Sequence, residues 1–301
     1  MHRRTGVVSF AYGPQFSPFR FHPTVSHLDR IMVVTSHIGW ACVERDAKPA
    51  VLLQSDEGET IFDRPERTIR ILADRDELAL TWFRYEPGQD GPEPHVHRRH
   101  TDAFYVLHGE LELGLGPEVT GMTGAAGTLA AAPPNVVHTF RNASSATVVF
   151  LNIHAPNIGF TEMLRAARDG RDEEAEEFDQ FEPPADGGRP LSDALFRAPG
   201  EGERITMGES SAVLKAEGSD VHGFFSLAET RLAPGFQAPI GCGDGALVDT
   251  FYVLEGTLSF QLGDKQVEAG PGAFGLVSPG SATFANRAAQ NVRVLNLIAP
   301  A

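Results

Sequence analysis

A hexapeptide that occurs twice constrains the fold of this chain more than any other sequence feature. Phe-Tyr-Val-Leu-His-Gly at 104–109 returns 147 residues later as Phe-Tyr-Val-Leu-Glu-Gly at 251–256. A second pair, Leu-Asn-Ile-His-Ala-Pro at 151–156 and Leu-Asn-Leu-Ile-Ala-Pro at 295–300, is 144 residues apart. Both pairs keep the same order along the 301 residues, which indicates a duplicated domain of about 105–110 residues.

Each copy has the composition of short β-strands. In the first copy, the segments 79–85, 103–107 and 146–153 are rich in aromatic and β-branched residues, and glycine or proline punctuates the chain between them. The whole chain contains 31 Gly and 21 Pro, which suits strands joined by turns and does not suit a helical bundle. The pattern predicts an all-β protein, built either as a sandwich or as a barrel.

The repeat defines the predicted domains. The first copy occupies 51–157 and the second 196–301. Residues 1–50 match neither copy and carry six Lys or Arg against three Asp or Glu. We interpret them as an N-terminal extension, which either has its own role, is disordered, or is the product of a start codon assigned too far upstream.

The segment 158–195 joins the two copies. Helical spacing of apolar residues predicts a short helix over 160–168, which Gly170 closes. The following residues, 171–188, contain eight acidic residues against one arginine and end in a Pro- and Gly-rich run. This composition is typical of a solvated linker.

Charge and cysteine usage restrict the partners and the compartment. A net charge of −15 argues against nucleic acid or an anionic membrane as the main partner. No apolar stretch approaches the roughly 18–20 residues that a membrane span needs. Cys42 and Cys242 lie 200 residues apart, which indicates free thiols in a reducing compartment and predicts a cytoplasmic protein.

A histidine-rich stretch in the first copy carries the predicted chemistry. On a strand, His95 and His97 point to the same face, Asp102 follows after four residues, and His138 lies on a later strand. Imidazoles together with a carboxylate suit Fe, Mn, Ni, Co, Cu or Zn. A divalent ion held by so few protein groups keeps open positions, as a catalytic site requires.

At these residues the sequence resembles the cupin superfamily. The first cupin motif, with its His-x-His, acid and glycine, matches His95, His97, Asp102 and Gly109. The second motif matches Gly127, Pro133, Asn135, His138 and Asn142 with correct spacing. The resemblance implies a bicupin, that is, two tandem double-stranded β-helix (jelly-roll) barrels, with His95, His97, Asp102 and His138 as ligands of one divalent ion per chain.

Two residues depart from the cupin motifs. Asp102 stands where the family has Glu, so as a ligand it must reach the metal with a shorter side chain. In the other interpretation, Asp102 does not bind the metal but accepts a hydrogen bond that orients a histidine. Asn135 stands where the family has Gly, a mild change because Asn tolerates the left-handed turn. We interpret His100 as exposed or as an orienting residue, with replacement of Asp102 as ligand left as the other reading.

The second copy lacks these ligands. Its stretch 239–244 contains no histidine, and the position of His138 falls on Ala282 or Thr283. Cys242, Asp244 and Asp249 lack a supporting imidazole, and we interpret His222 as structural. The second barrel is therefore predicted to bind no metal.

The predicted function follows from the resemblance and the metal site together. The leading hypothesis is a metal-dependent dioxygenase similar to the quercetin-dioxygenase-like bicupins, acting on a small aromatic or enolic substrate with Asp102 as the base. The alternatives are a non-catalytic bicupin that binds or senses a small molecule, and a cupin isomerase or decarboxylase. A homodimer is compatible with the resemblance, since cupins often pair by exchanging edge strands.

Overall fold

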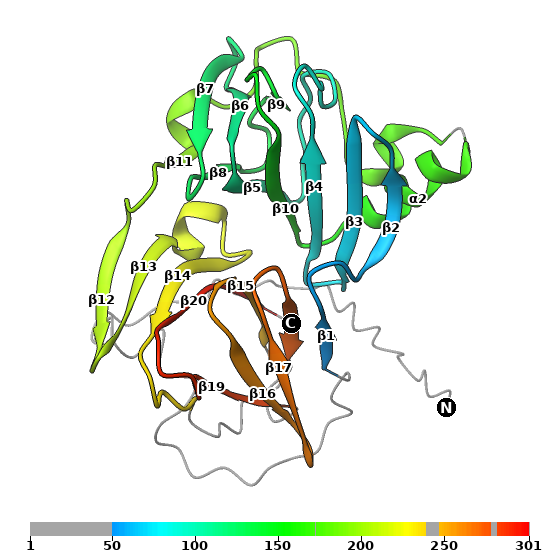
Figure 1. The fold of residues 1–301 in the computed structure, drawn as a ribbon. Coiled ribbons are helices and arrows are strands. Elements are labelled where there is room, and N and C mark those ends of the chain that lie inside the picture. Colours follow the sequence, from blue (N-terminus) through cyan, green and yellow to red (C-terminus); the bar gives the residue numbers. More distant parts are fainter. Residues whose placement is uncertain (1–49, 172, 239–246, 278–281, 301) are drawn as a thin grey trace, which may run out of the picture. The chain divides into compact units, whose positions relative to one another are not determined.

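The computed structural model describes residues 50–171, 173–238, 247–277 and 282–300. Within them the chain is almost entirely β, with one α-helix, α2, at Phe160–Asp169, in agreement with the predicted all-β class (Figure 1). The predicted N-terminal extension and the segment with Cys242 and Asp244 lie outside the described residues. In the part of the chain that the structure covers, no helix is both long and apolar enough to cross a bilayer.

Two barrels account for most of the strands. The first barrel contains β2 Glu59–Asp63, β3 Arg67–Asp74, β4 Ala79–Tyr85, β5 Thr101–His108, β6 Glu110–Leu115, β7 Thr120–Ala125, β8 Leu129–Ala132, β9 His138–Arg141 and β10 Val148–Ala155. The second contains β12 Glu203–Met207, β13 Ser210–Ala216, β14 Ser226–Leu232, β15 Leu247–Glu255, β16 Leu258–Leu262, β17 Lys265–Ala269, β18 Phe274–Val277, β19 Thr283–Ala285 and β20 Val292–Pro300.

The two barrels repeat one topology. In the first, the order β8-β5-β10-β4-β3-β2 forms the large sheet and β7-β6-β9 the small one. In the second, β18-β15-β20-β14-β13-β12 and β17-β16-β19 take the equivalent places. The glycine that ends each repeated hexapeptide lies at the same turn, with a φ of 75° at Gly109 and 80° at Gly256. A Cβ on Gly109 would lie 2.4 Å from the carbonyl oxygen of Thr147, so glycine is required there.

Two short strands cross the boundaries drawn from the repeat. β1, at Val51–Leu53, pairs with β18 of the second barrel, and β11, at Leu195–Arg197, pairs with β8 of the first. Each large sheet is thus extended at one edge by a strand from outside its own repeat. The exchange satisfies backbone groups that an edge strand otherwise leaves unpaired. Repetition in sequence identifies the copies but does not reveal which segment covers which edge.

Three apolar clusters form the core. The interior of the first barrel is aromatic, with Phe83, Tyr85, Phe104, Phe140 and Phe150 packed among aliphatic residues. A separate cluster fills the second barrel. The third cluster combines residues of both large sheets, among them Tyr105 and Leu151 from the first and Leu227 and Leu295 from the second. Burial of this shared cluster removes apolar surface of both barrels from water, which favours their association.

The segment between the barrels begins with the predicted helix. α2 spans Phe160–Asp169 and ends at Gly170, which has a φ of 65° and closes the helix as a left-handed cap. The short 3-10 turns η1, at Ala175–Phe178, and η2, at Leu191–Asp193, follow. Residues 175–189, here called the covering segment, run past the histidine-rich stretch of the first barrel. Phe181 exchanges two backbone hydrogen bonds with Val96, at 2.9 and 3.0 Å.

Candidate metal centre

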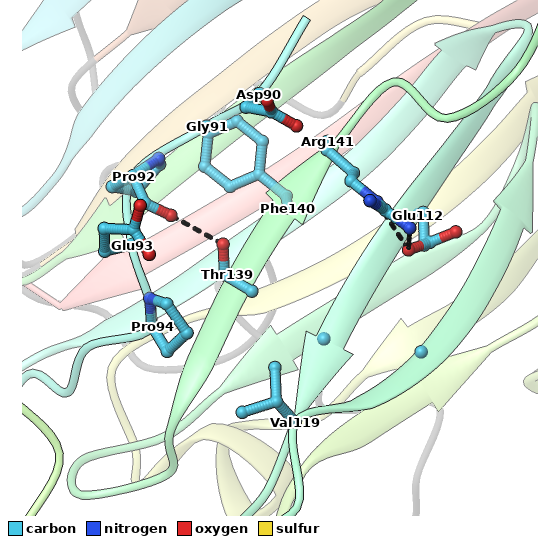
Figure 2. Close-up of a pocket in the computed structure, with 12 residues that line it drawn as sticks. Asp90, Gly91, Pro92, Glu93, Pro94, Glu112, Val119, Thr139, Phe140 and Arg141 are labelled. Atoms are coloured by element: carbon cyan, nitrogen blue, oxygen red, sulfur yellow. Dashed lines mark hydrogen bonds and ion pairs between the residues drawn. The ribbon is translucent and has the colours of Figure 1, made fainter. Parts of the chain in front are cut away.

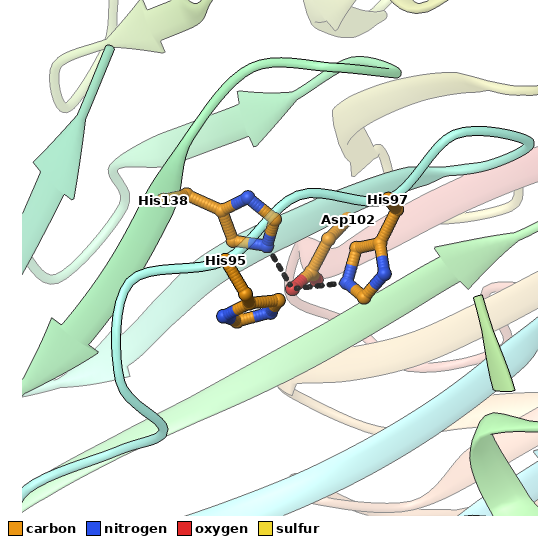
Figure 3. Close-up of side chains that lie close together, drawn as sticks. All are labelled: His95, His97, Asp102 and His138. Carbon is orange, nitrogen blue, oxygen red and sulfur yellow. Dashed lines mark hydrogen bonds and ion pairs between the residues drawn. The ribbon is translucent and has the colours of Figure 1, made fainter. Parts of the chain in front are cut away.

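The structure brings the four predicted ligands together from three parts of the first barrel. His95 and His97 lie on an extended segment before β5, Asp102 lies on β5, and His138 begins β9. His95 and His138 form an isolated antiparallel bridge, with backbone hydrogen bonds of 3.1 and 2.9 Å between them. The potential ligand atoms of all four side chains lie within 4.8 Å of one another. Figure 3 shows the four side chains grouped together.

The turn after β8 helps to place this bridge. Asn135 adopts a φ of 66°, as expected for a residue that replaces glycine in a left-handed turn. Its backbone N–H donates to the carbonyl of His97 at 2.7 Å. The second motif is thereby tied directly to the first.

Each ligand histidine has one ring nitrogen committed to a carbonyl. The Nδ1 atoms of His95, His97 and His138 lie 2.8, 2.8 and 3.0 Å from the carbonyl oxygens of Glu93, Asp179 and Val136. A carbonyl accepts only, so each Nδ1 carries the hydrogen and each Nε2 presents a lone pair. This is the tautomer in which a histidine binds a metal through Nε2.

Two observations show that the site fits a divalent transition-metal ion. His97 Nε2 is buried and has no hydrogen-bond partner among the described residues. His138 Nε2 lies 3.2 Å from Asp102 Oδ2. Two acceptors at that distance require a cation between them. The donor set, imidazole nitrogens with one carboxylate oxygen, is typical of Fe, Mn, Co, Ni, Cu or Zn.

Burial keeps these groups in their metal-binding forms. The four side chains have exposed fractions of 5% or less. Desolvation, with a contribution from the nearby His138, lowers the pKa of His95 to about 3. Desolvation also lowers the pKa of His97 well below its ordinary value. At Asp102 burial raises the pKa, but His154 and His138 outweigh it, and the pKa falls below its ordinary value. The neutral imidazoles of His95 and His97 therefore face an ionised carboxylate.

Asp102 is held by an asparagine of β10. Asn152 Nδ2 donates to Asp102 Oδ1 and, at 3.3 Å, to the carbonyl of Ala103. This leaves Oδ2 directed at His138 and, at 3.9 Å, at His97 Nε2. The shorter side chain of Asp therefore reaches the cluster, because Asn152 fixes one of its oxygens.

The covering segment contributes a residue that the sequence did not reveal. Most of 171–188 is exposed, as expected of a linker, but Asp179 has an exposed fraction of 0%. Its carboxylate accepts from the backbone of Arg98 at 3.1 Å and from the backbone and Nε of Arg99 at 2.8 and 3.1 Å. Burial opposes ionisation of Asp179, but hydrogen bonds from His100 and Arg99 lower its pKa to about 2. The sequence did not reveal Asp179, because it is one of eight acidic residues in 171–188 and no local pattern distinguishes it from the others.

His100 and His154 complete the polar cluster. His100 is fully buried, contrary to the exposed position considered from the sequence, and its Nδ1 contacts Asp179 Oδ2 at 2.9 Å. His154 lies on β10 directly opposite Asp102 and stacks on Phe160 of α2, with ring centroids 3.6 Å apart. A comparison of the two copies could have identified His154, because the second copy, which lacks the other histidines, has Ile298 at the same position.

The second barrel keeps only part of this arrangement. Asn296 Nδ2 donates to Asp249 Oδ1, as Asn152 does to Asp102. Pairing of β16 with β19 aligns Phe284 with Phe260, as Phe140 aligns with Leu113 in the first barrel, and so assigns Ala282 to the place of His138. Desolvation raises the pKa of Asp249 to about 7.

A pocket of about 300 Å³ lies beside the metal centre (Figure 2). Thr139 and Arg141, which alternate with His138 along β9, line it together with Asp90, Glu93 and Glu112. None of the four candidate ligands lines it. Because side chains alternate along a strand, Thr139 and Arg141 lie on the face of β9 opposite to His138.

Comparison with known proteins agrees with this architecture. Residues 81–154 match the Cupin domain family model. No curated protein sequence matches the chain.

Three solved structures show the shared fold at low identity. Protein Ylba from Escherichia coli has a TM-score of 0.59 at 14% identity, covering 86% of this chain and 95% of its own. A bacterial pirin from Escherichia coli in complex with nickel(II) has a TM-score of 0.56 at 15% identity, covering 83% and 99%. The oxalate decarboxylase–formate complex from Lactobacillus farciminis has a TM-score of 0.55 at 12% identity, covering 89% and 88%. Residues 81–154 therefore match a cupin domain, and the chain shares the fold of these three solved structures.

Proposed function

We propose that this protein is a metal-dependent dioxygenase that acts on a small aromatic or enolic substrate. The observation that carries the proposal is the convergence of three Nε2 lone pairs, from His95, His97 and His138, on the ionised carboxylate of Asp102. These four residues would hold one divalent ion. A redox-capable ion in that place supplies Lewis acidity and electron transfer to dioxygen chemistry.

The protein residues divide the remaining work. Asp102 would accept the proton of the substrate hydroxyl, with its Oδ1 held by Asn152 and its Oδ2 directed at the imidazole cluster. The backbone carbonyls of Glu93, Asp179 and Val136 orient the three imidazoles and make them more basic ligands. A base with a fixed orientation loses little entropy when the substrate reacts.

Aromatic residues beneath the ligands support the substrate class. Phe104 lies 6.5 Å from His138 and 5.0 Å from Phe140, measured between ring centroids. Phe140 in turn contacts Phe150 at 5.4 Å. This buried wall keeps water from the base of the site, and its apolar character suits an aromatic or enolic substrate.

One observation favours a second candidate, a module that binds a small molecule without turnover. All four ligands are buried, and the covering segment lies against the stretch that carries two of them. A closed site can retain a metal and a ligand without completing a reaction.

Oxygen uptake separates the candidates. The metal-free full chain is loaded in turn with Fe, Mn, Co, Ni, Cu or Zn and supplied with flavonols or β-diketones. Oxalate serves as a comparison substrate, and its turnover is measured as CO₂ release. The dioxygenase requires stoichiometric O₂ consumption in at least one metal form and its loss in Asp102→Asn. CO₂ release from oxalate without O₂ consumption indicates a decarboxylase, and tight metal binding without any turnover supports the binding module.

A further inference from the structure

Beside the four candidate ligands lies a second group of three histidines, His97, His100 and His154. All three are buried, and their potential ligand atoms also lie within 4.8 Å of one another. We propose that they form a second, all-imidazole metal position that competes with the first for His97. In a neutral imidazole one ring nitrogen carries the hydrogen and the other carries a lone pair that can bind a metal.

His100 donates its ring hydrogen to Asp179. The contact of 2.9 Å joins His100 Nδ1 to Asp179 Oδ2. The carboxylate already accepts from the backbone N–H groups of Arg98 and Arg99 and from the Arg99 guanidinium, so it is ionised and can only accept. In neutral His100 the hydrogen is therefore on Nδ1, and Nε2 carries the lone pair.

His154 donates its ring hydrogen to Asn152. The orientation of the Asn152 amide is set, because its Nδ2 donates to Asp102 and to the carbonyl of Ala103. Its Oδ1 therefore accepts, and His154 Nε2 lies 3.1 Å from it. In neutral His154 the hydrogen is on Nε2, and Nδ1 carries the lone pair.

The two lone pairs point at each other. His100 Nε2 and His154 Nδ1 are 2.8 Å apart. Two acceptors at this separation repel unless a cation lies between them, so the contact holds either a proton or a metal ion. A third lone pair, that of His97 Nε2, lies in the same group and has no hydrogen-bond partner among the described residues.

The surroundings favour a metal ion. Each of the three rings has its other nitrogen fixed by an oxygen, and His100 has the carboxylate backing that is common behind metal-binding histidines. With metal–nitrogen bonds of about 2.0–2.1 Å, tetrahedral ligand nitrogens lie about 3.3 Å apart. His100 and His154 thus need to separate by only a few tenths of an ångström. Three neutral imidazoles suit Zn, Cu, Ni or Co.

Sharing of His97 makes the two positions exclusive. An imidazole Nε2 has one lone pair and binds one ion at a time. An ion in the first position uses His97 with His95, Asp102 and His138, and an ion in the second uses it with His100 and His154. The chain therefore has two adjacent places for a single ion.

Cobalt binding tests the second position directly. In the metal-free full chain, His95→Ala with His138→Ala removes two ligands of the first position and none of the second. We expect this double variant to bind one Co²⁺ per chain, seen in the visible d–d absorption. Adding His154→Leu to it should weaken Co²⁺ binding at least tenfold, whereas adding His222→Leu, at an exposed histidine of the second barrel, should not.

Two results would disprove the second metal position. If the folded double variant takes up no Co²⁺, or binds it equally well with His154→Leu, a proton alone occupies the His100–His154 contact and the proposal is wrong. Circular dichroism establishes folding, and a His95→Gln, His138→Gln pair replaces the alanine pair if that pair does not fold. His154→Leu alone keeps all four candidate ligands of the first position, so Co²⁺ binding by this variant tests that position separately.

Discussion

The backbone carbonyl oxygen of Asp179 accepts a hydrogen bond from His97 Nδ1 at 2.8 Å, although 82 residues separate the two. The carboxylate of Asp179 also holds the turn that follows His97, through the backbone N–H groups of Arg98 and Arg99. One residue of the covering segment therefore fixes both the tautomer of a candidate ligand and the path of the chain beside it.

Removal of the Asp179 carboxylate should loosen the metal centre. Asp179→Ala leaves buried donors without an acceptor, so we expect a loss of about 2–4 kcal/mol in the free energy of unfolding, measured by urea titration. Metal affinity, measured by competition with a chelator, should fall at least tenfold, while Glu177→Gln, an exposed acid of the same segment, should change neither. Equal metal affinity in Asp179→Ala and wild type would show that the Asp179 carboxylate does not contribute to the geometry of the metal centre.

Asp102 should be needed for metal binding. Asp102→Asn replaces an ionised oxygen with a neutral amide, which is a weak ligand and accepts no proton, so metal affinity should fall at least tenfold. Asp102→Glu restores the usual cupin residue and should retain more metal than the amide variant. Elemental analysis of the purified variants measures both, and normal metal content in Asp102→Asn would remove Asp102 from the ligand set.

The chain should bind one tightly held ion. Ala282 occupies the place of His138 in the second barrel, and both positions in the first barrel share His97. Elemental analysis of wild type should therefore give one ion per chain. Two tightly bound ions would contradict either the exclusive use of His97 or the metal-free second barrel.

The metal-free protein should lose stability as the pH falls below about 6.5. Burial lowers the pKa of His95 to about 3 and the pKa of His97 in the same direction, so the unfolded state binds more protons in this range. Each group then changes the free energy of unfolding by about 1.4 kcal/mol per pH unit at most. Urea titrations should show a lower free energy of unfolding at pH 5 than at pH 7. A free energy of unfolding independent of pH would mean that these rings are protonated in the folded state.

Asp249 should give the opposite pH dependence in the second barrel. Its folded pKa of about 7 lies above the ordinary value of 3.8, so the folded state binds the extra proton and its contribution to stability is lost as the pH rises through 7. The advantage of the neutral, isosteric Asp249→Asn over wild type should therefore be larger at pH 8 than at pH 5, by about 1–3 kcal/mol, because most of the contribution is lost between these two values. Thermal unfolding at the two pH values compares them, and a variant less stable than wild type at pH 8 would show that the charged form is favoured.

Local patterns in the sequence carried a large part of the fold. The strand predicted over 79–85 and the helix predicted over 160–168 agree with β4 and α2, because alternation, helical spacing and the closing Gly170 act over neighbouring residues. The left-handed turn at Asn135 was predictable for the same reason. The convergence of His95, His97, Asp102 and His138 followed from motif spacing on a known fold.

Contacts between distant segments were beyond such patterns. β1 and β11 each join the sheet of the other repeat, because an unpaired sheet edge takes whichever strand the folded chain brings to it. His154 reaches Asp102 through the pairing of β10 with β5.

The amino-acid sequence by itself determined that this chain is a duplicated all-β protein with one histidine-rich barrel, since repeats, periodicity and motif spacing are properties of local order. Only the tertiary structure decided that Asp179 is buried against His97 and His100 while its acidic neighbours remain exposed. A row of similar carboxylates is chemically uniform along the chain. Which of them loses its water is set by the surface that folds against it, and that surface lies about 80 residues away in sequence.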